Sequence, residues 1–256
     1  NKRRGNRVRL IEMLYGNTGN NMAEKVIIGN AELWHGNCLD LLRTLPRADA
    51  LVTDPPYGIA YVHSGGGGAS STLEGAHRLG KAPPDTRPIH GDEKPFDPAP
   101  WLTFNKCVIF GADHFKTRLP EGGRFLCWDK SLGVGPADSF TDAEFAWTRE
   151  PVKRNVFRLM WKGLCCEKAG EDLMDGQFRR HHTSQKPLAL MRWAIESQRM
   201  KPGSVILDPY MGSGSTGVAA LSLGMRFVGV EIDRAHFDIA CARMEFAQRQ
   251  PDLAFA

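Results

Sequence analysis

The stretch SVILDPYMGSGSTG at residues 204–217 decides the fold, because it reads as a strand, a glycine-rich loop and the start of a helix. The apolar run stops at Asp208-Pro209, and proline cannot continue a central sheet ladder. Three glycines then permit a tight turn, and an apolar helical pattern runs from Val218 to Leu223. Strand, loop and helix in this order are typical of an α/β protein with a parallel sheet.

The same order of elements continues on both sides of this stretch. Phe227 to Val230 is predicted as the next strand, ending at Glu231, and Asp233 is suited to cap a helix that runs to Arg243. Together these segments predict an α/β fold with a doubly wound, mostly parallel sheet. Further strands are predicted at Ala48–Thr53, Lys106–Phe110 and Arg124–Trp128, and a further helix at Pro187–Gln198.

Length and composition favour one domain over residues 1–256, since a chain of 256 residues can bury one substantial core. Residues 59–100 are rich in glycine and proline and are predicted to form a mobile loop. No apolar run reaches the length of a membrane helix, and six cysteines without a CxxC pair favour a reducing cytoplasm. No metal is expected, although four residues make a weak candidate site: Cys165, Cys166, His181 and His182.

The glycine loop satisfies G-x-G-x-x-G from Gly212 to Gly217, and Glu231 lies at the end of the next predicted strand. Such a turn lets the backbone approach a ligand, while the acidic residue accepts hydrogen bonds from ribose hydroxyls. The pattern implies an adenosine-containing cofactor without naming it. A nicotinamide-dependent oxidoreductase would carry the same loop, and a purely structural turn is a further alternative.

A second strand end carries Asp54-Pro55-Pro56-Tyr57. An exocyclic amine on an aromatic base is a poor nucleophile, because its lone pair is delocalised into the ring. A carboxylate and a nearby carbonyl can hold both of its N–H hydrogens. We therefore assign Asp54 and the Pro55 carbonyl to these hydrogens, Pro55 and Pro56 to rigidity, and Tyr57 to stacking on the base. The alternative is a strand-end turn with an ordinary aspartate.

DPPYG at 54–58 together with DPYMGSGSTG at 208–217 resembles the beta-type DNA amino-methyltransferases, in which the catalytic motif precedes the cofactor motif. HGNCLDLLRTLP at 35–46, FLCWDK at 125–130 and HTSQKP at 182–187 extend the match over nearly the whole chain. The resemblance implies a Rossmann-like methyltransferase fold, a target-recognition segment at 131–180 and a cofactor-binding part at 182–243. It also implies methyl transfer from S-adenosylmethionine to N6 of adenine in double-stranded DNA after base flipping, with S-adenosylhomocysteine as product.

The resemblance further implies a set of residues around the cofactor. Asn37 stands where Asp is usual, Tyr210 where Phe is usual, and His-Thr-Ser at 182–184 replaces His-Pro-Thr. The implied cofactor residues are Asn37, Cys38, Thr183, Ser184, Gln185, Lys186, Asp208, Tyr210, Gly212, Gly214, Ser215, Thr216 and Glu231.

Basic residues in the recognition segment are expected to contact DNA, with aromatic residues such as Phe157 and Trp161 between them. The formal net charge of +4 is mild, so charge is supporting information, and a solvated surface is the alternative. The residues expected at DNA are Arg149, Lys153, Arg154, Arg158, Lys162, Arg179 and Arg180.

Several other functions share parts of this pattern. Methylation of cytosine N4 uses the same amine chemistry, but in the family Asp as the first motif residue leans towards adenine and Ser towards cytosine. RNA or protein-glutamine methyltransferases usually have Asn there. A catalytically silent DNA-binding module would carry a broken motif, and both motifs are intact here. Similar enzymes dimerise, so a second subunit is a further candidate partner, and a cytoplasmic, nucleoid-associated location is expected.

Overall fold

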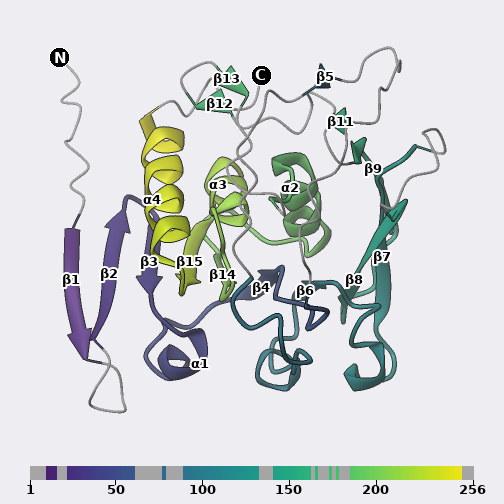
Figure 1. The fold of residues 1–256 in the computed structure, drawn as a ribbon, viewed down its shortest axis with the longest axis horizontal. Coiled ribbons are helices and arrows are strands. Elements are labelled where there is room, and N and C mark those ends of the chain that lie inside the picture. The colour runs from purple at the N-terminus through teal and green to yellow at the C-terminus, as the bar shows by residue number, and fades with distance from the viewer. Residues whose placement is uncertain are drawn as a thin grey trace.

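The computed structural model describes residues 10–15, 22–60, 77–78, 89–132, 141–162, 165–166, 173–174, 177–178 and 185–249. In these ranges, no helix combines the length and apolarity needed to cross a membrane. A ten-stranded sheet organises this part of the chain, in the order β1-β2-β3-β15-β14-β4-β6-β8-β7-β9 (Figure 1). Its strands are Leu10–Tyr15 (β1), Met22–Ile28 (β2), Ala31–His35 (β3), Ala50–Thr53 (β4), Cys107–Phe110 (β6), Arg124–Asp129 (β7), Ala143–Thr148 (β8), Val156–Arg158 (β9), Val205–Asp208 (β14) and Arg226–Glu231 (β15).

The centre of the sheet, from β3 through β15, β14 and β4 to β6, is parallel. Both flanks are antiparallel, except that β9 runs parallel to β7. Short strands also pair outside this sheet: His77–Arg78 (β5), Trp161–Lys162 (β10), Cys165–Cys166 (β11), Leu173–Met174 (β12) and Gln177–Phe178 (β13). The helices are Cys38–Leu41 (α1), Leu188–Ser197 (α2), Ser215–Ser222 (α3) and Arg234–Arg249 (α4), with 3-10 turns at Ala99–Trp101 and Lys116–Arg118.

The predicted strands and helices are confirmed, with shifts at their ends. The helix α3 begins at Ser215, three residues before the apolar pattern, because Gly214 takes a φ of 84° and starts the helix there. The helix α4 continues past the predicted end at Arg243 to Arg249. Gly217 allows α3 to pack closely against α4 and β15, since a Cβ there would lie 2.1 Å from Met244 Cε and 2.7 Å from the Phe227 ring.

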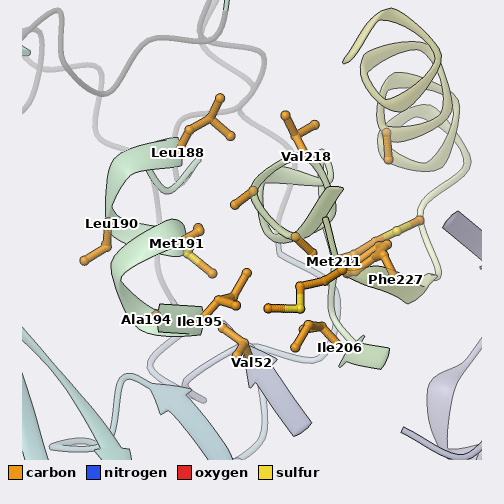
Figure 2. Close-up of a cluster of buried hydrophobic side chains, with 14 of the residues drawn as sticks. Val52, Leu188, Leu190, Met191, Ala194, Ile195, Ile206, Met211, Val218 and Phe227 are labelled. Carbon is orange, nitrogen blue, oxygen red and sulfur yellow. The ribbon is translucent and has the colours of Figure 1, made fainter. Parts of the chain in front are cut away.

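Both faces of the central strands are buried, as expected for parallel strands. One face packs against α2, α3 and α4, and Figure 2 shows Ile195 and Met191 of α2 directed towards Val52 and Ile206 of the sheet. Burying one such side chain contributes roughly 1.5–3 kcal/mol. The other face has a thinner cover among the described residues, made by α1 and by the segment around Trp101.

Parallel strands bring their carboxyl ends to one edge of the sheet, where ligands bind in open α/β folds. Five segments that follow β3, β4, β6, β14 and β15 therefore lie at this edge. These segments begin at Gly36, Asp54, Gly111, Pro209 and Ile232.

Two predicted segments contain parts that join the core. Within 59–100, Asp92 and Phe96 are buried, while residues 61–76 and 79–88 lie outside the described residues. Within 131–180, strand β8 enters the main sheet between β6 and β7. The division of the chain into a loop and a recognition segment therefore stays a prediction.

Candidate active site

Asp54 directly follows β4, and Asp208 is the last residue of β14, the parallel strand that pairs with β4. Thr53, the last residue of β4, connects the two strand ends, since its Oγ1 donates a hydrogen bond to Asp208 Oδ1 at 2.7 Å. The two sequence motifs therefore meet in space, although Thr53 and Asp208 are 155 residues apart in the sequence. The meeting point is the ligand-binding edge of the sheet.

Asp54 lies at the centre of a group of polar side chains. Tyr57 Oη donates a hydrogen bond to Asp54 Oδ1 at 2.6 Å. Lys186 Nζ forms an ion pair with Asp54 Oδ2 at 2.8 Å and donates to Tyr57 Oη at 3.1 Å. The Asp54 side chain is 21% exposed, so a substrate can reach it from solvent.

Two further charged residues complete this group, and the sequence reasoning gave them no role. Glu144 Oε2 of β8 lies 3.0 Å from Lys186 Nζ, and Lys130 Nζ lies 2.9 Å from Glu144 Oε1. The charges alternate along the series Lys130, Glu144, Lys186 and Asp54. The one available sequence signal was a glutamate inside the apolar strand AEFAWT at 143–148.

Burial and neighbouring charges set the protonation of these groups. Burial raises the pKa of Asp54, and the ammonium of Lys186 opposes this shift. Burial also disfavours the charged forms of Glu144 and Lys186, but their opposite charges outweigh it. The pKa of Glu144 is lowered to about 2, and the pKa of Lys186 is held well above its usual value. Lys186 and Glu144 are therefore both ionised at neutral pH.

The ring of Tyr57 is held by close contacts. His114 stacks on it, with ring centroids 5.0 Å apart and an interplanar angle of 17°. A Cβ at Gly111, whose φ is 72°, would lie 2.1 Å from Tyr57 Cε1, so this position requires glycine. The backbone after Tyr57 is fixed by the buried Asp92, which accepts hydrogen bonds from Gly58 N at 2.8 Å and Ile59 N at 3.3 Å.

Asp208 has a different environment, with 1% of its surface exposed. Its carboxylate accepts hydrogen bonds from Thr53 Oγ1 at 2.7 Å, Thr216 Oγ1 at 2.5 Å and Tyr210 N at 3.1 Å. Burial raises the pKa of Asp208 to about 7. This residue, predicted at the cofactor, thus connects β4, β14 and α3 through its own carboxylate.

The glycine loop has one open side. Gly212 takes a φ of 53°, and a Cβ added there would meet no atom within 4 Å. Glu231 fixes this loop, because its Oε2 accepts from Gly212 N at 2.8 Å and its Oε1 accepts from Asp233 N at 2.7 Å. The buried Arg243 supports it from below and donates to the Ser213 carbonyl, to Ser213 Oγ and to Ser215 Oγ.

Of the remaining predicted cofactor residues, Cys38 and Gln185 have contacts with residues of this loop or directly before it. Asn37 caps α1, with its Oδ1 accepting from Leu39 N at 2.9 Å. Burial raises the pKa of Cys38 to about 11, while a hydrogen bond to Tyr210 opposes the shift. Gln185 is buried, and its Oε1 lies 3.5 Å from Ser213 Oγ. Thr183 and Ser184 lie outside the described residues.

The residues predicted at DNA fall into several groups. Lys153, Arg154 and Arg158 are exposed. Arg149 is also exposed but is held by its own chain, because its Nη2 donates to the Leu102 carbonyl at 2.9 Å. The side chain of Lys162 and the whole of Arg179 and Arg180 lie outside the described residues.

The two aromatic residues predicted among these basic residues pack inwards. Phe157 stacks on Trp193 of α2, with ring centroids 5.3 Å apart, and Trp161 is 6% exposed. Both residues therefore contribute to the packing of the core. The described side chains include no group of three or more His, Cys, Asp and Glu able to hold a metal. The weak candidate site at Cys165, Cys166, His181 and His182 lies outside the described side chains.

Comparison with known proteins adds independent information. A family model described as DNA methylase matches residues 146–242. The Type II methyltransferase M.HinfI of Haemophilus influenzae is 34% identical over 104 residues, which is 41% of this chain and 27% of M.HinfI. The Type II methyltransferase M.ScaI of Streptomyces caespitosus is 26% identical over 258 residues, covering 83% of this chain and 81% of M.ScaI. This chain thus matches about a quarter of the first relative and most of the second.

Solved structures resemble the chain at low sequence identity. The cytosine-N4-specific PvuII DNA methyltransferase superposes with a TM-score of 0.52 at 13% identity, covering 89% of this chain and 93% of that protein. The M1.HpyAVI complex with SAM gives a TM-score of 0.49 at 22% identity. The PvuII likeness confirms the Rossmann-like methyltransferase fold that the motifs implied.

Proposed function

We propose that the chain is a member of the N6/N4 family of DNA methyltransferases, which it resembles in part of its sequence, and that it methylates the N6 amine of adenine at a specific DNA site, with S-adenosylmethionine as donor. The observation that carries the proposal is the environment of Asp54. Its carboxylate is partly exposed at the ligand-binding edge of the sheet and is paired with two side chains, Tyr57 and Lys186. Side-chain partners can rearrange when a substrate enters.

The proposed reaction uses Asp54 as a hydrogen-bond acceptor. The donor supplies a methyl group on a sulfonium, which passes to the amine nitrogen while the nitrogen loses one proton and S-adenosylhomocysteine is left. Asp54 and the Pro55 carbonyl hold the two amino hydrogens, and this favours a tetrahedral nitrogen. Because burial raises the pKa of Asp54, its carboxylate is a stronger proton acceptor than a solvated aspartate. Tyr57 stacks on the base, and Pro56 limits movement of the loop.

The proposed cofactor site is the open side of the glycine loop. An approach to the backbone at Gly212 is sterically free, which fits a ligand that lies against this loop. Glu231 keeps further lone pairs for ribose hydroxyls, although each of its oxygens already accepts a backbone N–H. The other residues proposed around the cofactor are Asn37, Cys38, Thr183, Ser184, Gln185, Lys186, Asp208, Tyr210, Gly214, Ser215 and Thr216.

Adenine is proposed over cytosine because Asp54 is the first residue of the catalytic motif, and in this family Asp leans towards adenine. The exposed Lys153, Arg154 and Arg158 are proposed to contact DNA phosphates. Base flipping is part of the proposal, since the amine in a paired duplex cannot be reached in line with the methyl group.

The test is to incubate the protein with DNA and S-adenosylmethionine, digest the DNA to nucleosides and identify modified bases by mass spectrometry. N6-methyladenine that disappears with Asp54→Ala is the expected result. N4-methylcytosine would keep the mechanism and replace the proposed base. If no base is modified although the cofactor binds, the proposal is wrong.

A further inference from the structure

The polar group around Asp54 contains a second, partly buried carboxylate, that of Glu144, which the proposed reaction does not use. Glu144 lies between two ammonium groups, with Lys130 Nζ at 2.9 Å from Oε1 and Lys186 Nζ at 3.0 Å from Oε2. Both lysine side chains are largely buried, at 10% and 9% exposure. Bringing these charges out of water is costly, and a structural role alone is weak justification for them.

The two oxygens of Glu144 are not equivalent. Oε1 accepts a hydrogen bond from Lys130. Oε2 is buried and close to Lys186, but among the described residues it has no partner with the angles of a hydrogen bond. The pair is therefore held by charge, and Oε2 keeps an acceptor position directed at the ammonium of Lys186.

The ammonium of Lys186 also stands where the substrate must bind. It lies 2.8 Å from Asp54 Oδ2, while Tyr57 Oη donates to Asp54 Oδ1. An amino group that is to donate to Asp54 competes with both of these partners. Lys186 can leave Asp54 only if its charge stays compensated, because an unpaired buried ammonium is strongly disfavoured.

Resting on the function proposed above, we infer that Glu144 is a positioning residue for methyl transfer, which receives the ammonium of Lys186 when the substrate amine takes its place at Asp54. The movement is short, since Nζ already lies 3.0 Å from Glu144 Oε2. Lys130 occupies Oε1 and leaves Oε2 to Lys186. The carboxylate of Asp54 is thereby freed for the amine, while the ammonium of Lys186 keeps an opposite charge beside it.

The charge of Glu144 also affects the pH dependence of the reaction, through the pKa of Asp54. Burial raises the pKa of Asp54, the charge of Glu144 adds to this shift, and the charge of Lys186 opposes it. Removing the Glu144 charge therefore lowers the pKa of Asp54. The charged or titratable groups near Asp54 in the described structure are Tyr57, His114, Lys130, Glu144, Lys186 and Asp208.

The experiment compares Glu144→Gln with the wild type and with Glu121→Gln, a control at an exposed position. Methyl incorporation into DNA from tritiated S-adenosylmethionine gives kcat as a function of pH, and calorimetry gives the Kd of S-adenosylhomocysteine. We expect kcat of Glu144→Gln to fall about tenfold or more, because Lys186 remains on Asp54 and competes with the amine. The acid limb of the profile moves to lower pH, the Kd stays within about twofold, and Glu121→Gln resembles the wild type.

A second variant covers the case in which Glu144→Gln does not fold. Glu144→Asp keeps the charge on a shorter side chain and is expected to recover part of kcat with an unshifted acid limb. Wild-type kcat and pH profile in a folded Glu144→Gln protein would overturn the inference. A parallel loss of Tm and cofactor affinity in both variants would show a structural role and would also overturn it. An inactive wild type would instead disprove the proposed function, and the role of Glu144 would fall with it.

Discussion

Asp54 and Asp208 end neighbouring parallel strands with almost the same local sequence, an apolar run followed by Asp, Pro and Tyr, yet their carboxylates differ in every contact. Asp208 is 1% exposed, and Thr53, Thr216 and the Tyr210 backbone hold it from three directions. The Asp54 side chain is 21% exposed and is paired with the side chains of Tyr57 and Lys186.

The difference lies in the donors. The partners of Asp208 belong to a strand end, a helix start and the backbone, so they are fixed once the fold has formed. The partners of Asp54 are a phenol and a flexible ammonium, which can exchange for a substrate. Asp208 therefore serves to join elements of the fold, while Asp54 is available for chemistry.

The largest effect is expected on kcat, when the carboxylate of Asp54 is replaced by an amide. Asp54→Asn should reduce kcat by about a thousandfold, equivalent to about 4 kcal/mol, because the amide is a weak acceptor and cannot take the proton. Its Tm should stay close to that of the wild type, since the side chain is partly exposed. Nucleoside mass spectrometry and calorimetric melting measure both quantities. A variant that loses stability but keeps its rate would reverse the comparison.

The second effect is expected on the stability of the fold, when the carboxylate of Asp208 is removed. Asp208→Ala should lower the free energy of unfolding by about 3 kcal/mol, because it leaves two buried hydroxyl donors, of Thr53 and Thr216, without their acceptor. Denaturant titration measures this loss, with Glu121→Ala as a control at an exposed position. An Asp208→Ala protein of unchanged stability would show that the carboxylate does not join the elements.

Sequence reasoning could predict the strand ends because proline, glycine and apolar runs act locally. It placed Asp54, Tyr57 and Asp208 at one edge of a parallel sheet correctly. It gave no role to Glu144, which lies in β8 and meets Lys186 only because the antiparallel flank folds next to β6. A charged residue inside an apolar strand stands out locally, but its sequence does not show which distant residue it will pair with.

The same limit applies to residues whose type suited another role. Phe157 and Trp161 matched a DNA-binding composition, yet Phe157 stacks on Trp193 of α2 and Trp161 is buried in the core. Asn37 was predicted near the cofactor, and its side chain also caps α1. Composition indicates which chemistry a residue can perform, whereas packing decides which surface receives it.

A third effect appears in the pH dependence of stability. The pKa of Asp208 in the folded protein is about 7, above its ordinary value of 3.8, so the folded state binds this proton more tightly than the unfolded state. Its contribution to stability is therefore largest at acid pH and decreases as the pH rises towards 7. Between pH 5 and pH 7 the wild type should lose about 2 kcal/mol more than Asp208→Asn. Equal slopes for the two proteins in denaturant titrations would contradict the raised pKa.

The smallest effect is expected when the hydrogen bond between Thr53 and Asp208, which connects the two strand ends, is removed. Thr53→Val keeps the shape of the buried side chain and removes the hydrogen bond to Asp208, so it should cost about 1 kcal/mol of unfolding free energy. Asp208 Oδ1 still accepts from Tyr210 N, which limits the loss. Because Thr53 also precedes Asp54, kcat shows whether the link serves the reaction as well as the fold. A rate within about twofold of the wild type would mean that Asp54 is positioned by its own partners; a rate that falls further than stability predicts would mean that Asp208 helps to place Asp54.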